Sequence, residues 1–343
     1  MSQNLIKRVL IVGLGSIGKR HLRLAREFLP HAEIAVLRHK VDLIIPEGAD
    51  YIFSTMVEAL AFAPTLAVIA SPANFHLAAA IPLAEAGVHL LIEKPLSATS
   101  EGVKDLIGVC KKTNAVLAVG YNLRYLQSLK KFKSMLDDQV IGSIWSVRSE
   151  VGQYLPSWRP GSDYRQGVSA QYALGGGVLR ELSHEIDYLC WIFGEVDWVQ
   201  AILAQQSDLE IDVEDTVHLV LGFAANGNER QLIASVNLDF IRQDTTRLCT
   251  AIGKLGSLRW NGIAGTVELW KLGTQDWKEI YKHQSTSDES YAAEWQDFIA
   301  CIKQDFQPLI TGADGLKALQ VVEAAHLAAK TKSQVKIGSV NEV

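Results

Sequence analysis

The sequence predicts a two-domain protein, with an α/β domain on a parallel sheet over residues 1–123 and an α+β domain over residues 124–343. Its 343 residues exceed the size of one ordinary domain. Up to about residue 120, short apolar runs alternate with helical stretches, which is typical of a parallel sheet covered by helices on both faces. After Phe193 the strand-like segments follow one another directly, which indicates an antiparallel or mixed open sheet.

The predicted elements of the first domain follow from this alternation. The strands are short apolar runs at Val9–Val12, Ile34–Leu37, Tyr51–Phe53, Leu66–Ile69, Leu90–Ile92 and Val116–Val119. The helices between them are predicted at Ile17–Phe28, Val57–Ala61, Phe75–Ala86 and Ser100–Thr113.

The second domain is predicted to begin with a helix at Leu126–Leu136 and a strand at Ile144–Val151. A loop from Gly152 to Tyr172 and a helix over Val178–Phe193 follow. The later strands are predicted at Trp198–Leu203, Thr216–Phe223, Gln231–Leu238, Arg247–Ile252, Ser257–Trp260, Val267–Leu272 and Trp277–Tyr281. Turns are expected at Asn226-Gly227 and Asn261-Gly262, and closing helices at Ala292–Lys303 and Ala313–Thr331.

Composition excludes several classes of protein. Hydrophobic residues make up 48% of the chain and charged residues 21%, so the chain can bury a sizeable core and is not disordered. A net charge of -5 argues against nucleic acid as a partner. No apolar run approaches the roughly 20 residues of a membrane span, and residues 1–8 have no signal core. The four scattered cysteines fit reduced thiols, so we expect a cytoplasmic protein.

A glycine-rich turn follows the first predicted strand. Gly13 permits the tight turn, Gly15 lets the backbone approach a pyrophosphate, and Gly18 lets the next helix pack closely on the strand. The helix N-terminus attracts the anion, and the intervening residues Leu14, Ser16 and Ile17 are expected to line the same site. The alternative is a flexible turn that only happens to contain glycines, but its place at the start of a βαβ series favours a dinucleotide-binding Rossmann domain.

The end of the second predicted strand bears on the choice of cofactor. An acidic residue about 20 positions beyond the glycines usually holds the ribose 2′-hydroxyl of NAD. Here the chain reads Arg38-His39-Lys40, with no carboxylate. Arg38 could pair with a 2′-phosphate, which favours NADP over NAD; the alternative is a solvated basic turn.

Several motifs give the chain a resemblance to the Gfo/Idh/MocA family, which includes glucose–fructose oxidoreductase and inositol dehydrogenases. They span nearly the whole chain and read GLGSIGKRH (13–21), SPANFH (71–76), EKPLS (93–97), GYNLRY (120–125), GGGVLRELSHEIDYLCWIFG (175–194) and ADGLKALQVVEAA (313–325). The resemblance implies a Rossmann domain, then an α+β domain whose large open, mainly antiparallel sheet often serves as an oligomer interface. It also implies hydride transfer between NAD(P) and a sugar or cyclitol carbon, in a homo-oligomer such as a dimer or tetramer.

The resemblance also assigns roles to residues after the fourth and fifth strands. Residues bordering the cofactor would be Ser71, Pro72, Asn74, His76 and Glu93. Lys94 would be the catalytic lysine, turned towards the nicotinamide if the bond to Pro95 is cis; the alternative is a surface lysine after a strand. These positions follow strands whose carboxyl ends bind ligands in open α/β folds.

The predicted helix over Val178–Phe193 gathers chemically active side chains on one face. At about 100° per residue, four of them fall within about 60° of His184, namely Arg180, Glu181, Asp187 and Tyr188. An imidazole there suits proton transfer near neutral pH, whereas a surface ion-pair cluster is the plain alternative. Many family members have Asp four residues before this histidine. Because Arg180 stands there, we predict Asp187, and then Glu181, as the acid beside a catalytic His184, and no metal site.

The loop over Gly152–Tyr172 is the predicted substrate loop. Aromatic faces stack on sugar rings, and guanidinium groups bind hydroxyls, carboxylates or phosphates. The candidate substrate residues of this loop and its surroundings are Tyr121, Arg124, Tyr154, Trp158, Arg159, Tyr164, Arg165 and Arg180. So many arginines suggest an anionic, sugar-like substrate; alternatively the loop packs the domains together.

The sequence therefore predicts an NAD(P)-dependent oxidoreductase that acts on a carbinol or keto carbon of a sugar-like substrate. Two alternatives stay open on the same fold. One is a non-catalytic NAD(P)-binding regulator or sensor, and the other is an NAD-dependent glycosidase.

Overall fold

The computed structural model describes residues 6–38, 44–159, 161–225 and 230–338. The chain packs into two compact units. The first comprises Met1–Asn122 and Tyr291–Leu319, and the second comprises Leu123–Ser290 and Gln320–Val343. A segment near the C-terminal end thus belongs to the first unit, and the boundary expected near residue 123 stays a prediction.

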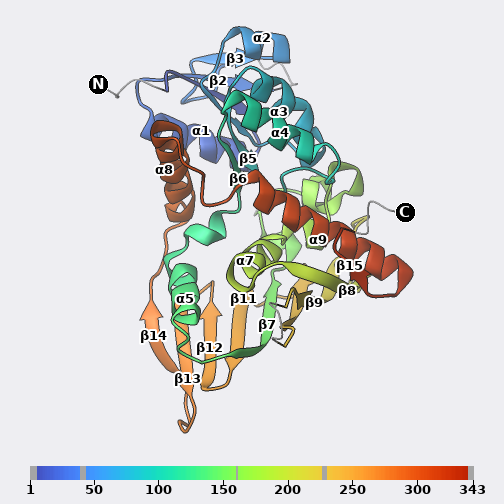
Figure 1. Cartoon of the computed structure of the whole chain (residues 1–343). Helices are drawn as coiled ribbons and strands as arrows, with labels where there is room; N and C mark the ends of the chain where they lie inside the picture. The colour runs from blue at the N-terminus through green and yellow to red at the C-terminus, as the bar shows by residue number, and fades with distance from the viewer. Residues whose placement is uncertain (1–5, 39–43, 160, 226–229, 339–343) are drawn as a thin grey trace. The chain divides into compact units, whose positions relative to one another are not determined.

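The first unit is built on a six-stranded parallel sheet (Figure 1). Its strands are β1 (Arg8–Val12), β2 (Glu33–Leu37), β3 (Tyr51–Phe53), β4 (Leu66–Ile69), β5 (His89–Glu93) and β6 (Leu117–Gly120). They lie in the order β3-β2-β1-β4-β5-β6, so the chain reverses its direction of travel across the sheet between β1 and β4. Ligands of open α/β sheets bind at such a switch point, outside the carboxyl ends of the strands.

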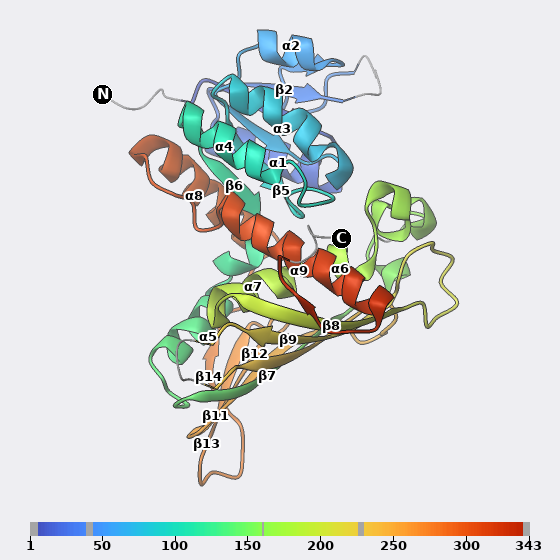
Figure 2. The same ribbon diagram turned by 45° about the vertical axis from the view of Figure 1, so that its right-hand side comes forward.

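Helices cover this sheet. They are α1 (Ser16–Phe28), α2 (Met56–Ala61), α3 (His76–Glu85), α4 (Val103–Thr113) and α8 (Glu289–Gln304). Figure 2 shows α3 and α4 side by side. Trp295 and Phe298 of α8 join the buried core formed by residues of β1, β2 and β4. A helix from the far end of the sequence therefore completes the core of the first unit.

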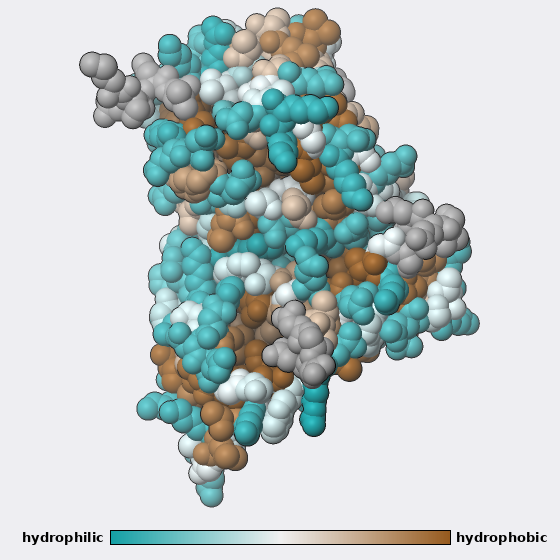
Figure 3. Space-filling view, viewed as in Figure 1, coloured by the Kyte–Doolittle hydropathy of each residue, from teal (hydrophilic) through white to brown (hydrophobic). Residues whose placement is uncertain are grey.

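An aromatic cluster closes one edge of the parallel sheet. Edge strand β3 carries Tyr51 and Phe53, whose rings lie 5.6 Å from the ring of Phe62. Hydrophobic residues gather on the surface over β3 and α2 (Figure 3), where Tyr51 is 42% and Val57 77% exposed.

The second unit contains a nine-stranded sheet in the order β14-β13-β12-β11-β7-β10-β9-β8-β15. Its strands are β7 (Ile144–Gly152), β8 (Val196–Ala204), β9 (Thr216–Phe223), β10 (Ile233–Asp239), β11 (Thr246–Gly253), β12 (Gly256–Asn261), β13 (Thr266–Lys271), β14 (Lys278–Lys282) and β15 (Val335–Lys336). β7 and β10 are parallel and the other pairs are antiparallel. The predicted fold class is confirmed; the short β15 was not predicted, and the turn at Asn226-Gly227 lies outside the described residues.

Two helices of the second unit agree with prediction and one does not. α5 (Gln127–Asp137) and α9 (Gly312–Thr331, which runs through both units) lie where the pattern placed them. The helix expected over Val178–Phe193 is broken into α6 (Val178–Glu181) and α7 (His184–Phe193). The amide of Ser183 bonds the Arg180 carbonyl, an i to i−3 contact that tightens the last turn of α6. The prediction of one continuous helix was therefore wrong.

Candidate active site

The glycine turn has the geometry that a dinucleotide needs. A Cβ on Gly18 would lie 2.2 Å from the carbonyl oxygen of Gly13, and a Cβ on Gly13 would lie 2.8 Å from the amide nitrogen of Ser71. Both positions therefore require glycine. A Cβ on Gly15 would meet nothing within 4 Å, and no side chain caps the N-terminus of α1. The N-terminus of α1 therefore has room beside Gly15 and no side-chain cap, so these residues fit a bound pyrophosphate.

The loops after β4 and β5 are tied together by a buried histidine. His76 places Nε2 2.7 Å from the carbonyl of Ser71 and Nδ1 3.0 Å from the carbonyl of Pro95. Burial lowers the pKa of His76, although the carbonyls beside it act in the opposite direction. A neutral ring can donate to only one of those two carbonyls. His76, predicted to border the cofactor, thus lies beneath both loops and joins them.

Lys94 follows β5 directly, at the carboxyl end of the parallel sheet. Its bond to Pro95 is cis, as the resemblance led us to expect. The Lys94 amide donates to Oε2 of Glu93 at 3.1 Å, and the lysine itself is half-buried. Glu93 therefore fixes the main-chain amide of Lys94.

Charged residues around α7 pair with one another. Arg124 donates from Nε and Nη2 to the two carboxylate oxygens of Asp187, at 2.9 and 2.7 Å, and both side chains are almost fully buried. Arg247 likewise donates to buried Glu185 at 2.9 Å. These contacts indicate a structural role for Arg124 and Asp187, which the sequence offered as substrate and catalytic residues.

The predicted polar face of this segment also does not face water. Asp187 and Tyr188 are 1% and 0% exposed, like the apolar Ile186 on the opposite side. The Tyr188 hydroxyl lies 2.7 Å from Oγ of Ser149 on β7. The expectation of a sharply amphipathic helix was wrong because Arg124 and the sheet residue Ser149, and not solvent, satisfy these polar groups. Half-buried His184 begins α7.

Arg180 lies one turn before His184, in a polar setting. Its Nη1 donates to the carbonyl of Gly176 at 3.4 Å, and its buried Nε has no hydrogen-bond partner among the described residues. Glu214 accepts from the Leu179 amide at 3.1 Å, and burial raises its pKa. Burial, and then the charge of Arg180, lower the pKa of His326 to about 4. Arg180 is thus a partly buried cation whose N–H donors are not all used by the described residues.

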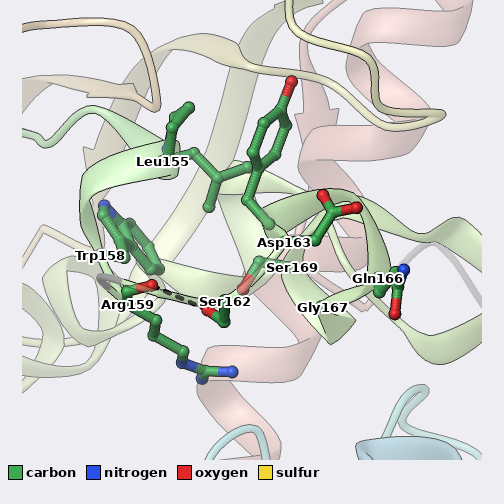
Figure 4. A pocket seen from close by; sticks show the side chains of 10 residues that line it. Leu155, Trp158, Arg159, Ser162, Asp163, Gln166, Gly167 and Ser169 are labelled. Atoms are coloured by element: carbon green, nitrogen blue, oxygen red, sulfur yellow. Dashed lines mark hydrogen bonds between the residues drawn. The ribbon is translucent and has the colours of Figure 1, made fainter.

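The predicted substrate loop folds into short helical turns around a cavity of about 440 Å³ (Figure 4). Its lining combines aromatic, hydroxyl, carboxylate and guanidinium groups, from Leu155, Pro156, Trp158, Arg159, Ser162, Asp163, Tyr164, Gln166, Gly167 and Ser169. Trp158 packs edge-on against Phe240, with ring centroids 5.1 Å apart. Arg165 pairs with Asp163 and Glu210 at 2.8 and 2.9 Å. The cavity therefore brings together Trp158, Arg159 and Tyr164, whereas Arg165 is held by carboxylates.

The other sequence-predicted residues vary in exposure. Gly15, Ser16 and Asn74 are exposed, while Leu14, Ile17, Arg38, Ser71, Pro72, Tyr154 and Glu181 are half-buried. Tyr121 is fully buried, and His39 and Lys40 lie outside the described residues.

Some polar residues escaped sequence reasoning. His21 and Trp295 form a buried hydrogen bond, and Glu294 is buried beside them. His21 stands three residues after Gly18 on α1, so its spacing from that glycine placed it on the packed face of the helix. No local signal marked Trp295 as its partner, because 274 residues separate the two.

Comparison with known proteins adds independent support. A family described as "Oxidoreductase family, NAD-binding Rossmann fold" matches residues 7–121, and "Oxidoreductase family, C-terminal alpha/beta domain" matches residues 133–337. Myo-inositol 2-dehydrogenase of Thermotoga maritima is 25% identical over 97% of this chain and 99% of its own.

Two solved structures share the fold. A levoglucosan dehydrogenase in complex with NADH and L-sorbose superposes with a TM-score of 0.84 at 21% identity, covering 98% of this chain and 100% of its own. The WlbA dehydrogenase from Bordetella pertussis, in complex with NADH and UDP-GlcNAcA, gives 0.79 at 23% identity, covering 96% and 98%. With both domain descriptions matched in order, this chain belongs to the Gfo/Idh/MocA oxidoreductase family.

Proposed function

We propose that this protein is an NAD(P)-dependent dehydrogenase or reductase that acts on a hydroxyl-bearing or keto carbon of a sugar-like substrate. The observation that carries the proposal is the position of Lys94. It follows β5, two strands from β1 and its glycine turn, at the carboxyl edge where α/β sheets bind ligands. The nicotinamide, when bound, supplies or accepts the hydride.

In this proposal Lys94 and His184 handle the proton of the substrate hydroxyl. An ammonium group can donate a proton or a hydrogen bond to a carbonyl oxygen that is being reduced, and an imidazole can take or give a proton near neutral pH. Glu181 is the remaining candidate to orient His184, since Asp187 is bonded to Arg124.

We further propose an anionic substrate. Arg180 is partly buried, and the accessible part of its guanidinium group can bind an acceptor such as a carboxylate. Arg159, Trp158 and Tyr164 line the loop cavity, where guanidinium and aromatic groups suit a charged sugar. NADP is the preferred cofactor in this proposal, because Arg38 and no carboxylate follows β2.

The experiment is a turnover assay with NADPH and NADH against sugars, cyclitols and sugar acids, followed by nicotinamide absorbance. Replacement Lys94→Met should lower kcat by about 10²–10⁴-fold while cofactor affinity is retained. The matched control is Lys104→Met, an exposed lysine on α4, which should keep wild-type kcat. Full turnover in Lys94→Met would reject the proposed role of this lysine.

A further inference from the structure

A chain of buried polar side chains lies behind the Glu93–Lys94 turn. It links α8, α1 and β5, all within the first unit. Trp295 Nε1 donates to Nδ1 of His21 at 3.0 Å, and His21 Nε2 lies 2.8 Å from Oε1 of Glu93. His21 and Trp295 are both 0% exposed, so these groups have no access to water.

The tryptophan fixes the tautomer of the histidine. An indole N–H can only donate, so Nδ1 of His21 must be the acceptor and carry no proton. The ring hydrogen of neutral His21 therefore resides on Nε2, which donates to Oε1 of Glu93. This assignment follows from the donor chemistry of Trp295 alone.

The carboxylate of Glu93 is in turn confined from two sides. Oε1 faces His21 at 2.8 Å, and Oε2 accepts from the Lys94 amide at 3.1 Å. On the neighbouring strand β6, a Cβ at Gly120 would lie 3.1 Å from Cδ and Oε2 of Glu93. A side chain at position 120 would thus crowd the carboxylate, and both of its oxygens receive N–H groups.

A second buried acid, Glu294, lies near this chain. It is 1% exposed, and neither carboxylate oxygen has a hydrogen-bond partner among the described residues. Burial, then the negative charges of Glu93 and Asp297, raise the pKa of Glu294 well above its usual value. Burial and the neighbouring negative charges therefore favour the neutral form of Glu294 more than in an ordinary carboxyl group.

We propose that His21 and Trp295 are positioning residues for Lys94. The indole sets the histidine tautomer, the histidine holds the Glu93 carboxylate, and the carboxylate fixes the main-chain amide from which the lysine side chain starts. The inference rests on the proposed role of Lys94. Losing this chain of hydrogen bonds should lower kcat more than it raises KM. The lysine is then displaced, whereas the cofactor-binding turn at Gly13–Gly18 keeps its position.

The test compares two equivalent substitutions. Trp295→Phe removes the indole donor to His21, and Trp260→Phe in the second unit removes an indole bond of the same length, 3.0 Å to Oγ of Ser128. Both tryptophans are 0% exposed, so the variants should lose similar stability. We expect Trp295→Phe to lower kcat about tenfold, with KM changed less than about twofold, and Trp260→Phe to leave both unchanged. Equal kcat in the two variants would overturn the proposal.

A variant series at His21 tests the same proposal should Trp295→Phe fail to fold. His21→Gln can accept from Trp295 through its amide oxygen and donate to Glu93 through its amide nitrogen, whereas His21→Leu can do neither. We expect His21→Gln to recover most of the kcat that His21→Leu loses. Equal kcat in the two His21 variants would overturn the proposal.

A spectroscopic readout separates this inference from the proposed function. Nitrogen-15 NMR of the full wild-type chain should show the Nε2–H tautomer of His21, and Trp295→Phe should admit the Nδ1–H form. An Nδ1–H tautomer in the wild-type chain defeats the inference whatever the activity. Turnover that survives Lys94→Met defeats the proposed function instead, so the two failures are distinguishable.

Discussion

In the first unit, the loops at the carboxyl edge of the sheet are joined by hydrogen bonds of neutral imidazoles and main-chain groups, whereas buried ion pairs hold α7 of the second unit. His76 joins the loop after β4 to the loop after β5 through carbonyl oxygens. Around α7, by contrast, Arg124 and Arg247 each neutralise a buried carboxylate. Both regions have polar side chains in their interiors, but among the residues that the structure describes it is the second that has paired formal charges there.

The difference shows how to tell binding groups from supporting ones. A buried charge whose partner satisfies it is committed to the fold, because removing either partner leaves an uncompensated charge. In the first unit the packed groups are supporting residues, whereas Gly15 is exposed and Lys94 is half-buried. The sequence predicted both Lys94 and Asp187 as catalytic residues. Their surroundings differ, because Asp187 is committed to an ion pair with Arg124, whereas Lys94 is half-buried.

Removing the charge of Asp187 should have the largest effect. Asp187→Asn leaves the buried Arg124 guanidinium without a counter-charge, so we expect the free energy of unfolding to fall by about 3–5 kcal/mol in chemical denaturation. The double variant Arg124→Met with Asp187→Leu should recover most of that loss. If Asp187→Asn kept its stability and lost turnover, Asp187 would be catalytic after all and the contrast between the units would fail.

Two glycines of one turn should respond differently to the same methyl group. Gly18→Ala places a Cβ 2.2 Å from the Gly13 carbonyl oxygen, so the free energy of unfolding should fall by about 1–3 kcal/mol. Gly15→Ala meets open space and should change stability by less than about 0.5 kcal/mol. Its NAD(P)H affinity should nevertheless fall by about tenfold or more, since the methyl group takes the space of the pyrophosphate. Fluorescence titration of bound NADPH measures this, and unchanged affinity in Gly15→Ala would contradict the assigned site.

Local sequence patterns were enough to predict the strands of the first unit. β3 and β4 begin and end at the predicted residues, and so does β9 of the second unit, because short apolar runs bounded by turn residues leave little choice of where a strand ends. The break at Leu182–Ser183 was missed because nothing local interrupts the helical period there.

Within the site, the sequence was informative where a motif places a residue directly after the end of a strand. The half-buried Lys94 and the open turn at Gly15 are of this kind. The sequence was uninformative where the role of a residue depends on a partner that is distant in the sequence. Arg124 and Asp187 are 63 residues apart, and that pairing is set by the tertiary fold alone.

Acid should destabilise the second unit through His326. Its pKa falls from 6.5 to about 4 on folding, chiefly because it is buried. Between those two values the unfolded chain binds the extra proton, so stability should fall as the pH drops from about 6.5 towards 4, by up to about 3 kcal/mol. His326→Asn should flatten the pH dependence of the unfolding midpoint relative to wild type, with the exposed His31→Asn as control. Because His76 is also buried with a lowered pKa, part of the dependence should remain.

Arg38 offers the smallest and most discriminating effect, because it tests whether the first unit uses a formal charge for its cofactor. The residue follows β2, where its amide bonds the carbonyl of Phe53 at 3.1 Å, so a substitution there leaves the main-chain contact intact. Arg38→Ser should weaken the binding of NADPH by about 0.5–1 kcal/mol, or roughly threefold, because Arg38 is only half-buried and water screens its contact with a phosphate. NADH, which has no 2′-phosphate, should bind as before. Equal losses for the two cofactors in parallel titrations would mean that Arg38 supports the fold of the turn, and the preference for NADP would have to be withdrawn.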